Sequence, residues 1–461
     1  MESIHLTLDY KGYNLGHVTE LRTQHSINEH SEVFISATLE EGEGIEPIFK
    51  TKVGSQLGII DKENSKIPIF EGMIKSIQIK HLSNVYFIEI IGVSNTFMLD
   101  AKLVRRSFQD ESMMYEALIN EVISKHANCE YIYKLDSKPI EAFTLQFDET
   151  DWQFLKRMAS RFNAGLVADY HSQKPSFFFG VPNGQNHGKL ENYNFYMKKD
   201  VKNFMVSSEN WNDKIADFDS RTFFIQTSKK FLIGDKVTHK RENLYVKSSK
   251  SEIVDGFLLY THELSTEMGL TQDNLFNDKI IGLSIKGKVL ETVRDEVKVH
   301  LEIDENPPSP PWEFSYTTSY TAEGNAGWYV MPEVGDTVYI YFPDNKEENG
   351  VGVNSIREKG GVSNPEIKVF RTPNGKELKF TPEEIVITCL DEDIFIRLNE
   401  NTGIEIISSR PINVVSDSNI NMKAEELVTI TASKEILLTC QSSYVKLDNK
   451  VHVEGTEVFI S

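Results

Sequence analysis

Apolar and polar residues alternate along much of the first hundred positions, as in short strands that bury one face. The clearest runs lie at 33–39, 74–79 and 85–90. A polar turn, 40–44, follows the first run. Several short alternating runs separated by turns are typical of a β-barrel or a β-sandwich.

Two segments have helical spacing instead. Residues 112–125 carry apolar side chains at every fourth position, which predicts one amphipathic helix. A second helix is predicted over 150–164, where Asp148 or Thr150 could cap the free backbone donors. Gly165 can end that helix, because glycine readily adopts the left-handed conformation found at helix C-termini.

Short strands dominate again between 278 and 358. Their clearest examples are 283–293, 297–303 and 337–342. This density of strands predicts a small closed barrel such as an OB-fold. The preceding region, 1–277, is predicted as an α+β hub domain that consists of two β-barrel-like parts and the two helices.

The most regular pattern follows residue 385, where pairs of apolar residues recur every eight positions. The two members of a pair are two positions apart and therefore lie on the same side of a strand. Looser copies lie at 385/387, 394/396, 451/453 and 458/460. The regular copies are Ile404 and Ile406, Ile412 and Val414, Ile420 and Met422, Val428 and Ile430, and Ile436 and Leu438.

A single copy of this repeat is not stable alone. Two buried apolar side chains contribute about 1.5–3 kcal/mol each, whereas ordering each backbone residue costs about 1–2 kcal/mol. Three chains that turn their apolar rows toward a common axis would bury all of these side chains together and offset the cost of ordering the backbone. We therefore predict an intertwined trimeric β-helix over 385–461, with these ten regular apolar residues in its core and a neck over 359–384. A single-chain solenoid usually needs about 20 or more residues per turn, and an ordinary sandwich would have turns of varied length.

Composition excludes several other classes of function. The formal net charge is -20, which disfavours a phosphate-binding nucleic-acid surface. Trp312, Trp328 and Tyr339 could stack on bases in an OB-fold, but in so acidic a chain we assign them to packing. The three cysteines, Cys129, Cys389 and Cys440, are too sparse for a disulfide framework or a zinc knuckle.

The sequence also carries no enzymatic motif that we could identify. It contains no HExxH, no paired CxxC, no P-loop and no GxSxG nucleophile elbow. Its many carboxylates occur by chance in pairs, so they do not indicate a glycosidase. We expect no catalytic residue, no metal site and no cofactor. The start of the chain has no basic and apolar leader, so we expect synthesis in the cytoplasm without a signal peptide.

Four segments together resemble the VgrG family of contractile injection systems, which is related to the hub and spike of phage tails. Asn28-Glu29-His30 is similar to the family's first hub barrel, and 147–157 (FDETDWQFLKR) to the start of a hub helix. The segment 327–338 (GWYVMPEVGDTV) looks like the end of its OB-fold. The octads resemble its spike, although they lack the regular glycine of some relatives.

This resemblance implies a non-enzymatic spike that joins an inner tube to a membrane-puncturing tip. The implied partners are two further copies of the chain, a hexameric tube protein, baseplate proteins, effector cargo, and a PAAR-like tip protein at Val458, Phe459 and Ile460. The assembled particle would leave the cell or enter a target cell. The machine could be a type VI secretion system, an extracellular injection particle, a tailocin or a phage tail. A peptidoglycan-cleaving spike and a receptor-binding tail fibre are the alternatives. No lysozyme-sized insertion separates the barrel from the octads, which speaks against the first.

Overall fold

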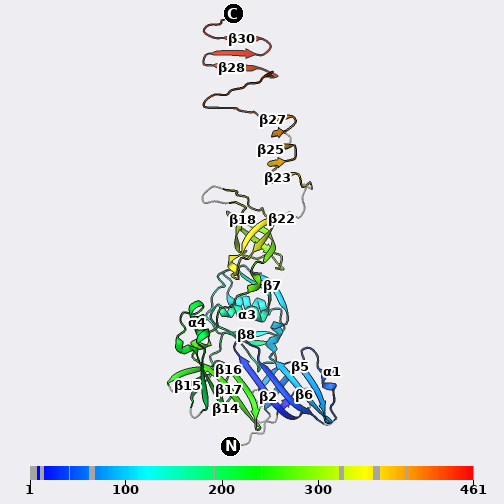
Figure 1. The fold of residues 1–461 in the computed structure, drawn as a ribbon, viewed down its shortest axis with the longest axis vertical. Coiled ribbons are helices and arrows are strands. Elements are labelled where there is room, and N and C mark those ends of the chain that lie inside the picture. The colour runs from blue at the N-terminus through cyan, green and yellow to red at the C-terminus, as the bar shows by residue number, and fades with distance from the viewer. Residues whose placement is uncertain are drawn as a thin grey trace. The chain divides into compact units, whose positions relative to one another are not determined.

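One long, mainly antiparallel sheet organises the N-terminal part of the chain in the computed structural model of the protein (Figure 1). The chain forms two compact units, Met1–Glu358 and Lys359–Ser461. Strands far outnumber helices, which confirms the prediction of a mainly β protein with a few helices. The structure describes residues 8–10, 15–40, 42–61, 68–190, 193–239, 241–320, 327–356, 364–390 and 393–459.

The long sheet has twelve strands, and its two halves meet where β2 pairs with β16. The two parts predicted for the hub thus share one continuous sheet, with a separate apolar core beneath each half. The path of the sheet is β1 (Leu8–Tyr10), β4 (Gln56–Asp61), β5 (Phe70–Leu82), β6 (Val85–Val93), β3 (Glu32–Leu39), β2 (Leu15–Ser26), β16 (Glu242–Val254), β17 (Phe257–Ser265), β14 (Arg221–Thr227) and β13 (Phe195–Lys199). Off this path, β15 (Lys236–His239) pairs with β16, and β12 (Asn186–Lys189) pairs with β15.

A helical layer packs next to this sheet around its own apolar core. No helix among the described residues is long and apolar enough to cross a membrane. Small sheets accompany the helices: β7 (Leu103–Phe108) with β9 (Thr144–Thr150), and β8 (Glu130–Tyr133) with β11 (Ser176–Phe179) and β10 (Leu166–Ala168). The helices are α1 (Glu46–Lys50), α2 (Tyr115–Ile123), α3 (Asp151–Ser160) and α4 (Val201–Asn210), with short 3-10 turns η1 (Asn95–Asp100), η2 (Asp217–Ser220), η3 (Met268–Leu270) and η4 (Asp278–Ile280).

Thr150 is the residue that caps α3. Its hydroxyl accepts a hydrogen bond from the backbone N–H of Gln153 at 3.1 Å, and the Gln153 side chain accepts from the backbone N–H of Thr150 at 3.3 Å. This reciprocal pair satisfies two backbone donors that a helix start leaves free. Asp148, the other candidate cap, instead pairs with Arg105 at 2.8 Å.

A closed five-stranded barrel completes the first unit. Its strand order is β18–β19–β20–β22–β21, and only β20 and β22 pair in parallel. The apolar side chains point into the barrel and form its core. The strands are β18 (Ser284–Val293), β19 (Glu296–Leu301), β20 (Glu313–Thr317), β21 (Thr337–Tyr341) and β22 (Val351–Ile356), and the 3-10 turn η5 (Glu347–Asn349) lies between the last two.

The second unit consists of two antiparallel meanders with an extended stretch between them in sequence (Figure 1). Within 409–435 no strand is assigned. The first meander contains β23 (Lys368–Arg371), β24 (Glu377–Phe380), β25 (Glu384–Leu390), β26 (Ile394–Asn399) and β27 (Gly403–Ser408), and the second contains β28 (Ile436–Cys440), β29 (Ser443–Leu447) and β30 (Val451–Glu454).

Candidate assembly interface

One face of the first meander is almost entirely apolar. The register places Ile385, Leu398 and Ile404 opposite one another in one cross-strand row, and Ile387, Ile396 and Ile406 in a second row. Directly paired residues of antiparallel strands share a face, as do residues two apart on one strand. The two rows therefore form one surface, which Phe370, Leu378 and Phe380 extend across β23 and β24.

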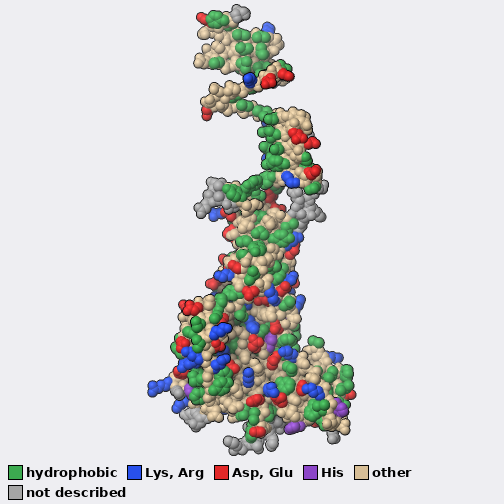
Figure 2. Space-filling view, viewed as in Figure 1, with side chains coloured by type: hydrophobic (Ala, Val, Ile, Leu, Met, Phe, Trp, Pro, Cys, Tyr) green, Lys and Arg blue, Asp and Glu red, His purple; other side chains and the backbone are tan. Residues whose placement is uncertain are grey.

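This apolar face is open to solvent in the single chain. Ile404 is 70% exposed and Ile406 is 60% exposed, and the other isoleucines of the two rows are also exposed. Figure 2 shows hydrophobic side chains gathered on the surface of the second unit. On the opposite face, Arg397 pairs with Glu405 at 2.9 Å and with Glu384 at 3.3 Å. The sheet thus has one face with charged pairs and one apolar face, which is the pattern of a sheet that buries its apolar face against a partner.

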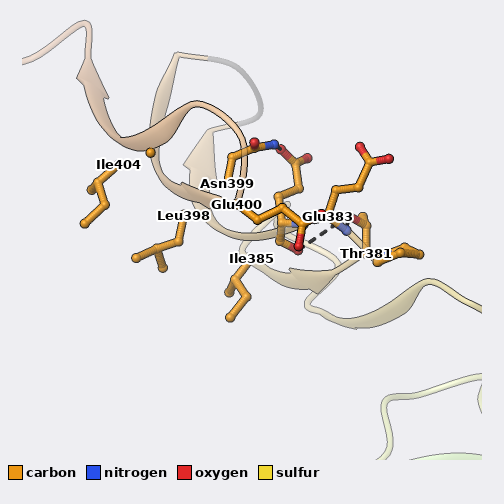
Figure 3. A pocket seen from close by; sticks show the side chains of 10 residues that line it. Thr381, Glu383, Ile385, Leu398, Asn399, Glu400 and Ile404 are labelled. Carbon is orange, nitrogen blue, oxygen red and sulfur yellow. Dashed lines mark hydrogen bonds between the residues drawn. The ribbon is translucent and has the colours of Figure 1, made fainter.

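The apolar row continues into a shallow hollow at one end of the meander. The hollow has a volume of about 410 Å³, and Ile385, Leu398 and Ile404 line it together with residues 381–384, Asn399, Glu400 and Gly403. In Figure 3 these three apolar side chains lie side by side and point to the same side of the sheet. Glu383 and Glu400 lie at its polar rim (Figure 3). The hollow therefore belongs to the apolar face.

The second meander repeats the same arrangement. Leu438 pairs with Val445, and Val445 pairs with Val453, so these three side chains form a row on one face. Ile436, Leu447 and Val451 form the parallel row. Leu438, Val451 and Val453 are all more than half exposed. Both meanders thus leave their apolar rows uncovered within one chain.

The stretch between the meanders, 409–435, has few backbone partners and leaves its apolar side chains uncovered. Ile412, Val414, Ile420, Met422, Val428 and Ile430 are all exposed there. Among the described residues, no backbone-to-backbone hydrogen bond forms within 411–435. Backbone donors and acceptors of a stable structure find partners in nearly every case. A single copy supplies neither the backbone pairs nor the apolar contacts that this stretch requires.

In the first unit, the barrel is joined to the hub through a shared apolar core. Phe143 and Leu145, on or next to β9, are fully buried among barrel residues. The Phe143 ring lies 5.0 Å from the Phe314 ring and 6.0 Å from the Phe342 ring. Beside this contact, the Asp304 carboxylate accepts hydrogen bonds from the backbone N–H and the hydroxyl of Ser107, at 2.7 and 2.6 Å. The hub segment thus plugs one end of the barrel.

A buried ion network crosses the same junction. Glu347, on the barrel turn η5, is 2% exposed and pairs with Arg157 and, at 2.9 Å, with Arg161 of the hub. It also accepts a hydrogen bond from the backbone N–H of Leu145 at 3.0 Å. Arg157 reaches Glu149 through two nitrogens, at 2.9 and 2.6 Å. Two arginines and two glutamates balance each other in charge, so this network joins the barrel to α3 and the residue after it.

The neighbouring carboxylates stabilise the charged form of Arg157. Burial alone would lower the pKa of this guanidinium, but the carboxylates of Glu347 and Glu149 outweigh burial and the pKa is raised. Arg157 therefore stays charged at any ordinary pH and always needs these partners. Among the described residues, no group of three His, Cys, Asp or Glu side chains is placed to hold a metal ion.

Comparison with known proteins gives a fold but no sequence relative. No family model matches the sequence, and no curated protein matches it. The c3393 protein of E. coli, described as a type VI secretion component structurally similar to the T4 tail proteins gp27 and gp5, superposes with a TM-score of 0.55 at 10% identity, over 76% of this chain and 100% of that one. This chain has a VgrG-like fold.

Structures of a PdpA–VgrG complex give the same result. A chain of the lidless complex superposes with a TM-score of 0.53 at 11% identity, over 85% of this chain and 94% of that one. A chain of the lidded complex, from Francisella, has the same TM-score and identity, and 76% of it is covered. The structural resemblance to VgrG that the sequence predicts is thus confirmed.

The VgrG-like chain places the predicted core residues in three environments. Ile404 and Ile406 lie on β27, and Ile436 and Leu438 lie on β28; each pair belongs to an apolar face, with one residue in each of its two rows. The other six lie in the extended stretch. Of the predicted tip-binding residues, Val458 and Phe459 are exposed, at 53% and 89%, and Ile460 lies outside the described residues.

Several residues of the interface are absent from the sequence-based prediction. Phe370, Leu378 and Phe380 belong to the apolar face, although 359–384 was expected only to form a neck. The hairpin turn at 372–375, with Gly375 at a φ of +76°, is the signal that could have revealed these strands. The partners of Arg157 had no such signal, because Glu347 lies 190 residues away in the chain.

Proposed function

We propose that this protein is the structural spike and hub of a contractile injection system. The observation that carries the proposal is the uncovered apolar face of the second unit, which continues a first unit of VgrG-like fold. The hub would match the end of a hexameric inner tube, and the second unit would transmit force toward the target membrane. The role is mechanical, and the proposal assigns no residue to catalysis.

The second unit is proposed to become an intertwined β-helix of three copies. Three apolar faces turned toward a common axis would exclude water from the two rows, Ile385/Leu398/Ile404 and Ile387/Ile396/Ile406. The charged pairs around Arg397 would then face outward. The extended stretch 409–435 would gain strand partners from the neighbouring copies. This arrangement uses every feature that a single chain leaves without a contact.

The five-stranded barrel is proposed to be an OB-fold that forms a collar. Its strand order β18–β19–β20–β22–β21, with one parallel pair closing the barrel, supports this assignment. The domains would then be a hub over 1–277, an OB-fold over 278–358, a neck over 359–384 and a spike over 385–461. The Glu347 network would hold the collar to the hub while the particle is loaded.

The proposed partners follow from this architecture. A PAAR-like protein would cap the exposed apolar side chains of Val458 and Phe459, and tube and baseplate proteins would contact the hub. The relatives are seen with PdpA; for this chain, effector cargo is part of the proposal. The protein would be made in the cytoplasm and carried out of the cell within the particle.

Removal of the octad region tests the trimer. The full chain should have the mass of a homotrimer under native conditions at micromolar concentration. A chain that ends at residue 384 loses the apolar rows of β25–β30 and should be monomeric. A trimeric coiled coil fused after residue 384 should restore the trimer mass and serves as the control for folding. A stable monomer of the full chain contradicts the proposal, and an unchanged trimer of the shortened chain places the contact in the first unit.

A further inference from the structure

A strip of buried polar side chains runs along the line where the two halves of the long sheet meet. On either side of this line the core is apolar. The β2–β16 pair itself directs small polar groups and a histidine inward, and β17 adds a second histidine in the same cross-strand row. We call this strip the seam; its residues are Thr23, His25, Ser249, Ser251 and His262, each less than 5% exposed.

The seam is covered by residues from two loops rather than by an apolar layer. The ring of Tyr170, which follows β10, stacks on the ring of His25 at 3.5 Å. Phe231, between β14 and β15, packs its ring 4.8 Å from that of His262. Thr23 and Ser251 share a hydroxyl hydrogen bond of 2.6 Å across β2 and β16. A hydroxyl hydrogen bond and aromatic ring contacts thus join the two halves along the seam.

Lys230 brings a positive charge into this cover. Its ammonium group lies 2.8 Å from Nε2 of His171 and 3.4 Å from the carbonyl oxygen of Pro68. An ammonium group can only donate, so Nε2 of His171 must accept and cannot carry a proton. Protonation of His171 would break this bond and set two positive charges side by side. The closed seam therefore requires a neutral His171.

The other histidines of the seam share this requirement. Burial lowers the pKa of His25 well below its ordinary value, and the charge on Lys230 acts in the same direction. Burial lowers the pKa of His262 to about 4, although its Nε2 lies 2.9 Å from the carbonyl oxygen of Lys229. Burial also lowers the pKa of His171, despite Asp169.

Few acidic side chains lie close enough to stabilise a protonated histidine in the closed seam. Asp169 lies 3.6 Å from Nδ1 of His171. Asp235 pairs with His187 at 2.7 Å. Glu71 lies 3.5 Å from Nε2 of Gln173. Burial lowers the pKa of Lys230 to about 8, so this lysine is charged at neutral pH and adds no further pH dependence below it. On balance, the surroundings lower the pKa of His25, His171 and His262 and favour their neutral forms.

We propose that the seam is an acid-labile joint, at which the two halves of the hub part when the solution becomes mildly acidic. Each of the three histidines is neutral when the seam is closed and can take up a proton when it opens. Each can therefore raise the ratio of open to closed seam by up to about tenfold per pH unit below pH 6.5. For His262 this window extends from about 6.5 down to about 4. The joint would allow the hub to loosen in an acidic compartment without loss of its other contacts.

Hydrogen exchange of the full chain at pH 7 and pH 5.2, corrected for the chemical exchange rate, tests this joint. Amides in β2 and β16 should lose protection by at least about tenfold at the lower pH. Amides in β6 and in residues 75–82 of β5, which lie in the same sheet away from the seam, should change by less than about threefold. Equal protection of the seam at both pH values, or an equal loss in all four strands, overturns the proposal.

Substitutions separate histidine protonation from general acid sensitivity. His171→Gln keeps an acceptor for Lys230 but cannot take up a proton, so the loss of protection in β2 and β16 should shrink several-fold. His17→Gln, at an exposed position of β2, is the matched control and should behave like the unmodified chain. If His171→Gln does not fold, Lys230→Gln should also weaken the pH effect, because it removes the charge that opposes protonation. An undiminished effect in either folded variant overturns the proposal. None of these results depends on the proposed trimer.

Discussion

Ile406→Asp should convert the trimer into monomers. Ile406 lies in the apolar rows of the first meander, 60% exposed in one chain. If three copies bury it, its loss costs about 1.5–3 kcal/mol per copy, or about 5–9 kcal/mol for the trimer. An unpaired carboxylate in the same dry contact adds a further penalty. The trimer dissociation constant should therefore worsen by at least about a thousandfold, which sedimentation velocity over a range of concentrations can measure.

The adjacent residue provides a matched control. Ile407 lies on the same strand but pairs with Phe395 on the opposite face, and it is 45% exposed. Ile407→Asp makes the same chemical change and should leave the trimer intact, because that face carries the charged pairs of Arg397. Loss of the trimer in both variants would show that the strand, rather than its apolar face, is sensitive. Retention in both would place the contact elsewhere.

The sequence pattern predicts which residues lie on the apolar face, but it does not predict their partners on the neighbouring strands. Alternation alone predicts that Ile404 and Ile406 share a face, and the register agrees. It does not reveal that Ile385 lies opposite Leu398, because antiparallel pairing reverses the order of residues around each turn. The repeat pattern instead matches Ile385 with Ile394, the first residue of the next looser copy. Alternation in the sequence determines on which face of the sheet a residue lies, whereas its partner on the next strand depends on the length and geometry of the turn.

The polar features of the first unit could not be predicted in this way. Glu347 lies in a stretch of charged residues that reads as an exposed loop, yet it is buried against α3. His25 alternates with Leu21, Thr23 and Ile27 on the buried side of this segment, so the pattern predicts burial but no chemistry. Charged residues carry no periodic signal, because their burial is decided by partners far away in the chain. Such contacts become visible only when the fold brings both partners together.

Glu347→Gln should destabilise the first unit more than any other single loss of charge in it. The substitution removes the carboxylate that balances Arg157, which is 3% exposed and stays charged. Glu149 remains as a partner, but Arg161 and the backbone N–H of Leu145 also lose their charged acceptor. Removing one member of a buried ion network typically costs about 3–5 kcal/mol.

Chemical denaturation of the full chain, followed by the fluorescence of Trp152 and Trp312 near the junction, can measure this loss. The neighbouring Glu348 is exposed, so Glu348→Gln makes the same change in charge and should shift the unfolding free energy by less than about 0.5 kcal/mol. Equal effects of the two variants would show that the network contributes nothing specific. If Glu347→Gln also lets the barrel unfold before the hub, the network is what makes the two unfold as one body. Unfolding of the barrel and the hub as one body in the unmodified chain is expected of a collar that must stay attached under load.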